Sequence, residues 1–199
     1  YEDVTNVDAV GLITARSGLE IGLAGVGGTI TSAGIITAPH IRTGGKLNLT
    51  GLGLNVLDAN TTGTDNTAVG HKALHSNTTG AYNIGIGASA LLTNSTGDAN
   101  VAVGQHALRS NTTGTSNVAI GYASLVSNQT GNNNIAIGAN ALDLVTSSYN
   151  TGVGFNALTA CTTGASNTGV GNGVLAANTT GNYNTAMGSG TLSANTTAT

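Results

Sequence analysis

The histidines of this 199-residue chain offer its best spacing for metal chemistry. His71 and His75 are four residues apart, and two histidines at that spacing on one helix face can hold a metal ion. Glycine, asparagine and threonine are frequent around them, and these residues disfavour helix. We therefore expect both imidazoles to face solvent. His40 has no acidic residue near it in the sequence that could orient its ring.

Other residue types that support catalysis or cofactor binding lack the local patterns that those functions need. The eight carboxylates show none of the repeated spacings of calcium-binding β-rolls. The glycine-rich segment GLAGVGG at 22–28 is not followed by the Lys-Ser/Thr pair of a phosphate-binding loop. No serine lies in a nucleophile elbow. The sequence thus predicts a protein that is not an enzyme and holds no cofactor or metal.

Three tyrosines are candidate ligand contacts. Tyr82, Tyr149 and Tyr183 each directly precede an asparagine. Exposed tyrosines are frequent at binding surfaces because the ring is apolar and the hydroxyl polar. The sequence leaves open whether these rings contact a sugar or only cover the edges of the repeats described below.

Cys161 is the only cysteine, so one chain cannot form an internal disulfide. It occupies a position that is asparagine in seven other repeats, and Val145 is the further exception. A packed free thiol is the simpler interpretation. A bond between two chains is the alternative, and it requires a proximity that sequence does not show.

Charge and hydropathy argue against two classes of partner. Charged residues make up 7% of the chain and the five Lys and Arg are scattered, whereas nucleic-acid binding needs basic patches. Apolar runs such as 34–38 are far shorter than the ~20 residues of a membrane-spanning helix. The first residue is Tyr1 and not methionine, so we expect a piece of a longer or processed polypeptide.

An internal repeat must position all of these residues. From residue 49 a unit of 17 residues occurs nine times, and only the unit that starts at Asn134 is one residue shorter. Its outline is N-[TVI]-[AG]-[VI]-G-x-x-A-L-x-x-N-T-T-G-x-x, numbered below as positions 1 to 17. The units begin at Leu49, Asn66, Asn83, Asn100, Asn117, Asn134, Asn150, Asn167 and Asn184.

Two positions of the unit never vary, as stacked coils with equivalent environments would require. Position 5 is always glycine and position 9 always leucine. We expect both to form ladders along the stack. The glycines are Gly53, Gly70, Gly87, Gly104, Gly121, Gly138, Gly154, Gly171 and Gly188, and the leucines are Leu57, Leu74, Leu91, Leu108, Leu125, Leu142, Leu158, Leu175 and Leu192.

The period predicts an all-β fold, a parallel β-solenoid of nine coils over residues 49–199. Seventeen residues are too few for a helix-turn-helix repeat, which needs about 34. Positions 2 to 4 alternate as a strand does, and we expect a second short run to end on the leucine. The Val/Ile residues and the leucines would form ladders inside the coil. We expect position 15 glycine to need positive φ and the asparagines to bond along the axis.

Position 3 of the unit is always glycine or alanine. It lies on the opposite side of the expected strand from positions 2 and 4. A face open to water would normally collect polar residues there, so small apolar residues suggest close packing. We predict that a neighbouring copy of the same chain packs against this column.

Residues 1–48 lack the unit and form a predicted stem or connector. They echo themselves in GLITA at 11–15 and GIITA at 34–38, with glycine turns between. Pro39 is expected to close a strand. We predict a β-rich segment, which in a trimer would be an intertwined β-prism that sets the register of the solenoid.

The motif N-T-A-[VI]-G joined to A-L-x-x-N-T-T-G, as in NTAVGHKALHSNTTG at 66–80, resembles the repeats of phage tail-fibre and related virion structural proteins. Segment 1–18 is similar to one that recurs in those proteins. The N-[TVI]-A-[VI]-G core is also similar to the head repeat of trimeric autotransporter adhesins, a left-handed parallel β-roll with shorter coils. These resemblances imply a homotrimeric fibre or filament exposed on a virion or cell surface.

Three functions stay open. The first is a rigid spacer or attachment element of a fibre. The second is an adhesin that recognises a cell-surface glycan or receptor through irregular outward residues such as Tyr122, His106 and Arg109. The third is ice binding by the paired threonines of N-T-T-G, although these adjacent residues enter a turn, whereas ice-binding solenoids generally present threonines one residue apart on a flat strand.

Overall fold

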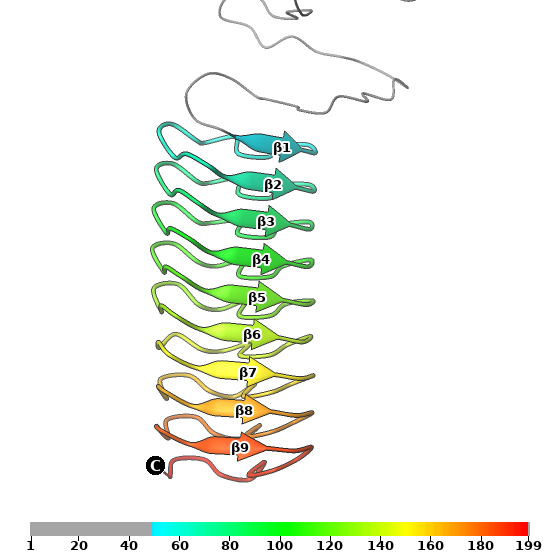
Figure 1. Ribbon diagram of the computed structural model, residues 1–199, viewed down its shortest axis with the longest axis vertical. Helices are drawn as coiled ribbons and strands as arrows, with labels where there is room; N and C mark the ends of the chain where they lie inside the picture. The colour runs from blue at the N-terminus through cyan, green and yellow to red at the C-terminus, as the bar shows by residue number, and fades with distance from the viewer. Residues whose placement is uncertain (1–48, 199) are drawn as a thin grey trace, which may run out of the picture. The chain divides into compact units, whose positions relative to one another are not determined.

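The computed structural model describes residues 49–198 as a regular stack of nine parallel strands, one in each repeat (Figure 1). The all-β solenoid predicted from the period is confirmed. No helix occurs in the described residues, and so none that could cross a membrane. The predicted stem, residues 1–48, lies outside them. The strands are β1 Thr50–Leu52, β2 Thr67–Val69, β3 Ile84–Ile86, β4 Val101–Val103, β5 Val118–Ile120, β6 Ile135–Ile137, β7 Thr151–Val153, β8 Thr168–Val170 and β9 Thr185–Met187.

Each strand pairs with the next one along the chain, and equivalent positions of the repeat lie opposite each other. In β2 and β3, Thr67 pairs with Ile84 and Val69 with Ile86. The register survives the shorter sixth repeat, because Ile135 of β6 still pairs with Thr151 of β7. One repeat is therefore one full circuit of backbone, laid on the circuit before it.

Hydrogen bonds between coils continue through the turns as well as the strands. The Leu74 amide donates to the Ala90 carbonyl at 3.0 Å, and the Thr78 amide donates to the Ser95 carbonyl at 2.9 Å. Equivalent bonds recur along the stack. Neighbouring coils are thus joined around the whole circuit, which resists bending and shear more than a single three-residue strand would.

The predicted second run ending on leucine is not a strand. Positions 6 to 11 form turns, and the leucine at position 9 has a left-handed backbone, with φ of 50° at Leu74 and 54° at Leu125. Position 7 is also left-handed, as at Lys72 with φ 57°. Left-handed and right-handed backbone conformations alternate along this turn. The chain therefore turns tightly, and its N–H groups can still bond to neighbouring coils. Left-handed geometry costs about 1 kcal/mol for a residue with a side chain, which burial of the leucine offsets.

The side chains that fill the interior differ from those predicted. Position 9 leucines such as Leu108 are completely buried, and so are position 3 residues such as Ala102. The Val/Ile residues of positions 2 and 4 point outward instead, with Ile84 and Ile86 each 38% exposed. The prediction of internal Val/Ile ladders, with position 3 packed against a neighbouring copy, is wrong.

Volume explains this reversal. A Cβ added at Gly152, a position 3 glycine, would lie 3.0 Å from Cγ of Leu142. A Cβ at Gly85 would lie 3.3 Å from Cγ of Leu74. Beside each leucine the narrow coil has room only for a hydrogen or a methyl group. Position 3 is therefore small because it faces the chain's own core.

Candidate functional site

The invariant glycines of position 5 lie where the backbones of successive coils approach closely. Their φ values are positive, for example 122° at Gly70 and 133° at Gly104. A Cβ added at Gly104 would lie 2.5 Å from the Gly121 carbonyl oxygen of the next coil. Both the backbone angle and the spacing require glycine, so the close stacking of the coils explains this ladder.

The glycine of position 15 is needed for a different reason from the one predicted. The position 15 glycines, such as Gly80, do not have positive φ. A Cβ on Gly80 would lie 2.5 Å from the Gly97 carbonyl oxygen and 2.6 Å from Oδ1 of Asn77. The prediction of positive φ is wrong, and the close approach of two coils and a buried asparagine explains the glycine.

The asparagines of position 1 form a buried polar ladder. Nδ2 of Asn100, which is completely buried, donates to the Gly114 carbonyl at 2.8 Å. Its Oδ1 accepts the Asn117 amide at 3.0 Å. Each of these side chains thus closes its own coil and holds the next one. The expected bonding along the axis is present in this ladder.

A second asparagine ladder runs along position 12. Nδ2 of Asn94 donates to Oδ1 of Asn77 at 2.8 Å and to the Gly97 carbonyl at 2.9 Å. Val145 and Cys161 interrupt this ladder in two successive coils, and both side chains are completely buried. An asparagine that is completely buried, such as Asn94, is not accessible to a glycosylating enzyme, although the N-T-T sequence matches the acceptor pattern.

Cys161 is a buried free thiol, within hydrogen-bonding distance of the Gly164 carbonyl at 3.3 Å. Burial raises its pKa from the usual 9.0 to about 11. Below pH 9 this shift alone leaves about 100-fold less thiolate in the folded chain than in the unfolded one. We expect alkylation by iodoacetamide at pH 8 to be slower by at least that factor than in guanidinium chloride, as mass spectrometry would measure. Equal rates would contradict burial.

The same thiol gives stability a definite pH dependence. The unfolded chain loses the thiol proton near pH 9 and the folded chain near pH 11. The folded state therefore binds more protons between these values, and the free energy of unfolding falls as pH rises through this window. A Cys161→Ser variant lacks this component, which comparison of the two unfolding curves would isolate.

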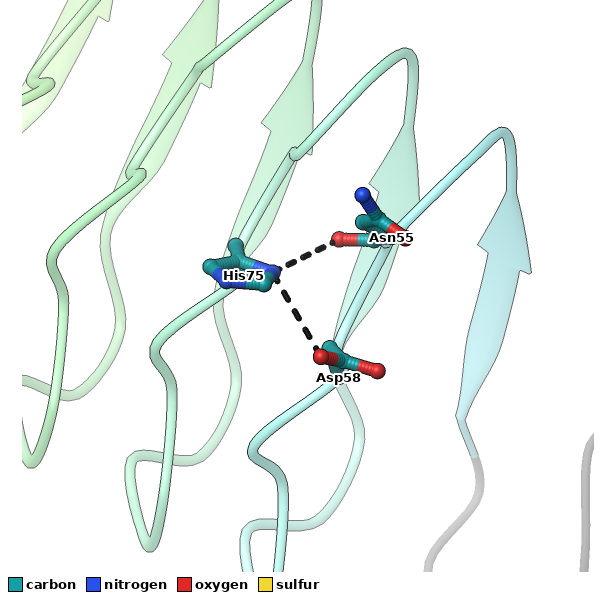
Figure 2. A network of polar contacts seen from close by, with 3 residues as sticks. All are labelled: Asn55, Asp58 and His75. Carbon is teal, nitrogen blue, oxygen red and sulfur yellow. Dashed lines mark hydrogen bonds and ion pairs between the residues drawn. The ribbon is translucent and has the colours of Figure 1, made fainter.

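The histidines do not come together. Nδ1 of His75 lies 3.1 Å from the Asn55 carbonyl oxygen and 3.9 Å from Oδ2 of Asp58 (Figure 2). The ring of His106 instead meets Tyr122 edge-on, with centroids 6.2 Å apart. In the part of the chain that the structure describes, no three His, Cys, Asp or Glu residues gather as metal ligands do.

The three candidate tyrosines lie on one edge of the outward strand face. Tyr82 and Tyr149 are 64% exposed and Tyr183 is 79% exposed. All three occupy position 17, immediately before the residue that opens a coil. We call this column the amino rim: Asp65, Tyr82, Ala99, Ser116, Asn133, Tyr149, Ser166 and Tyr183.

The opposite edge of the strands carries further exposed rings, Tyr122 at 55% and Phe155 at 51%. Both occupy position 6, directly after the invariant glycine. We call this column the carboxyl rim: Leu54, His71, Ala88, Gln105, Tyr122, Ala139, Phe155, Asn172 and Ser189.

Between the rims lies the largest feature that the sequence did not reveal, an outward apolar face. It consists of positions 2 and 4 of all nine strands and contains only Thr, Ile, Val, Leu and Met. Among the described residues, every exposed large hydrophobic side chain except Leu144 and Leu192 lies on this face or on a rim. The constant small size of position 3 was the signal that could have shown which side of the strand is the interior.

The described residues thus form structural ladders inside the coil and an uncharged apolar face outside it. Comparison with known proteins adds no identity to this geometry. No protein-family model, curated protein or solved structure matches the chain.

Proposed function

We propose that this protein is a rigid structural module of a virion tail fibre or of another extracellular appendage, where it acts as a spacer or attachment element. One observation carries the proposal: hydrogen bonds and buried asparagine ladders join coil to coil around the circuit and along the described stack. Bending such a rod would break many bonds at once. A repeat stack of this kind supplies length and stiffness by repetition alone.

We propose that the working unit is an assembly of identical chains, a homotrimer, on the outside of a virion or cell. The apolar face is exposed in a single chain, and large exposed apolar surfaces commonly mark protein interfaces. End-to-end stacking into a filament is the alternative assembly.

Lengthening the rod tests the spacer function. Duplicating residues 100–133 adds two coils, so the chain should remain folded and its longest dimension should grow by about 10 Å, twice the strand spacing. Small-angle X-ray scattering measures the length and circular dichroism the fold. A variant that unfolds, or that stays the same length, would overturn the rod-like spacer.

A glycan-binding adhesin is the second candidate, favoured by the exposed tyrosines of the amino rim. A glycan array probed with the native protein and with a Tyr82→Ala, Tyr149→Ala, Tyr183→Ala variant tests it. Signal that disappears in the triple variant supports sugar binding by this rim. A blank array with the native protein favours the spacer.

Ice binding is the third candidate, and the hydroxyl groups of the turn weigh against it. Oγ1 of Thr78 donates to the Ser95 carbonyl at 2.9 Å, and that of Thr61 donates to Thr78 in the same way. Because the hydroxyl group of position 13 is used in this way, only the threonine of position 14 points outward in each turn. The stack then presents one row of threonines and not two parallel rows. We expect no thermal hysteresis from the purified protein.

A further inference from the structure

We propose that the apolar face and its two rims form the interface between copies of this chain, and that the copies run parallel and in register. This inference rests on the proposed function, in which identical rods assemble side by side. It adds the surface, the partner and the polarity of that assembly.

The size of the surface fits a stable interface. Nine strands about 4.8 Å apart span about 38 Å along the stack, and the six residue steps from rim to rim span at most about 20 Å at 3.3 Å each. The resulting area is at most about 760 Å². Specific protein interfaces bury about 800 Å² on each partner.

The period and the charge of the face select a copy of the same chain as the occupant. Side chains of positions 2 and 4 form ridges that recur once per coil along nine strands. A second rod of the same period meets these ridges with one spacing along its whole length. The face has no charged side chain, so a nucleic acid or an acidic polymer would find no compensating charge on it.

The rims show how two copies fit. In any parallel cyclic assembly of facing sheets, the amino rim of one copy meets the carboxyl rim of the next at the same coil. In three coils a bulky residue then faces a small one: Tyr82 meets Ala88, Tyr122 meets Ser116, and Tyr183 meets Ser189. Within one chain the two residues of each pair lie at opposite ends of a strand and cannot touch each other. Their complementary sizes can therefore matter only in a contact between chains.

One coil carries an aromatic residue on both rims. Tyr149 and Phe155 flank β7 and are 64% and 51% exposed. In the parallel arrangement Tyr149 of one copy meets Phe155 of the neighbouring copy. Aromatic pairs contribute about 0.5–1.5 kcal/mol beyond the area they bury, so this coil should be the strongest contact of the rims.

An antiparallel arrangement fits less well. The four strands in which positions 2 and 4 are both Val or Ile are β3 to β6. Reversing one copy about the centre of this block sets Ala88 against Ala139 and Ala99 against Ser116. Each rim then has one pair of small residues that leaves a gap, and Tyr149 no longer meets Phe155, so contact energy is lost.

The first experiment removes the apolar character of the face without touching the core. Ile120 points outward and is 38% exposed, so Ile120→Asp should leave the coil folded and reduce the assembly to single chains. Leu144→Asp is the matched control, because Leu144 is 45% exposed but lies off the face and the rims. Light scattering gives the mass and circular dichroism the fold.

The second experiment reads polarity and register through disulfides, in a Cys161→Ser background. The pair Ser116→Cys and Tyr122→Cys belongs to one coil and should cross-link copies into a covalent trimer. Ser116→Cys with Phe155→Cys is two coils out of register, about 10 Å, and should not, because a disulfide needs Cα atoms within about 7 Å. The pair Ala88→Cys and Ala139→Cys should cross-link only antiparallel copies.

The outcomes separate this interface from the proposed function. Cross-linking by the in-register pair, together with single chains for Ile120→Asp, supports the interface. A native protein of single-chain mass, an assembly unchanged by Ile120→Asp, or cross-linking by the Ala88/Ala139 pair overturns it, while the rod-like spacer is judged separately by the coil-duplication experiment. An in-register covalent dimer keeps the interface and overturns the threefold arrangement.

Discussion

Replacing Gly104 by alanine is expected to lower the free energy of unfolding by roughly 4 kcal/mol, a loss as large as severe backbone strain or core packing defects cause. The residue has φ of 133°, a backbone angle that side chains rarely adopt. The added methyl would also lie 2.5 Å from the Gly121 carbonyl oxygen and 2.7 Å from its carbon. Neither atom belongs to a flexible side chain, so relief requires the two coils to separate. Thermal unfolding followed by circular dichroism measures the loss.

Gly173→Asn is the matched control for this substitution. Gly173 also has positive φ, 58°, but no atom lies within 4 Å of an added Cβ. Asparagine tolerates that left-handed geometry, and Asn140 and Asn156 already occupy the same position in earlier coils. The control should keep its unfolding temperature. If Gly104→Ala also unfolds like the native chain, close backbone approach is not what holds position 5 as glycine.

Replacing Asn100 by alanine is expected to lower the free energy of unfolding by about 2–3 kcal/mol, since a buried polar group left without a partner costs about 1–3 kcal/mol and the side chain's own hydrogen bonds are lost as well. The completely buried side chain donates to the Gly114 carbonyl and accepts the Asn117 amide. It also donates to Oδ1 of Asn83 at 3.1 Å. Its removal leaves the Asn117 amide without its acceptor, whereas the Gly114 carbonyl keeps the bond from Asn111 and Oδ1 of Asn83 keeps the bond from the residue 100 amide. Unfolding in guanidinium chloride is the measurement.

Asn140→Gly provides the comparison for this ladder. Asn140 donates only one side-chain bond, to Asn156 at 3.2 Å, and is half-buried on the outside of the coil. Glycine keeps its left-handed backbone, with φ 54°. The expected loss is below about 1 kcal/mol. Equal losses for the two variants would mean that the buried position of the ladder adds nothing to stability.

Much of the fold is readable from the repeat. Equivalent residues recur every 17 positions, and the structure places them opposite each other in neighbouring strands, as Thr67 and Ile84 show. Periodicity identifies neighbours in a stack because each coil repeats the environment of the coil before it. The strand at positions 2 to 4 was also predictable from its alternation.

The direction in which that strand faces was not predictable from its alternation. Alternation shows that Ala102 and its neighbours Val101 and Val103 lie on opposite sides, but not which side is the interior. Hydrophobicity favours burial of the valines, yet the structure buries the alanine. The interior is too narrow for a branched residue at position 3, because a Cβ at Gly152 would already lie 3.0 Å from Cγ of Leu142 in the preceding coil. This constraint arises only when the circuits close and stack.

The sequence by itself determined the circuit length, the parallel register and the identity of the glycine, leucine and asparagine ladders, because these follow from a period that every coil obeys. Only the tertiary structure decided what lies inside and what lies outside. The reason is steric: closing 17 residues into one coil leaves a core that holds one leucine beside small residues, and the surplus Val and Ile side chains must face outward as an apolar surface.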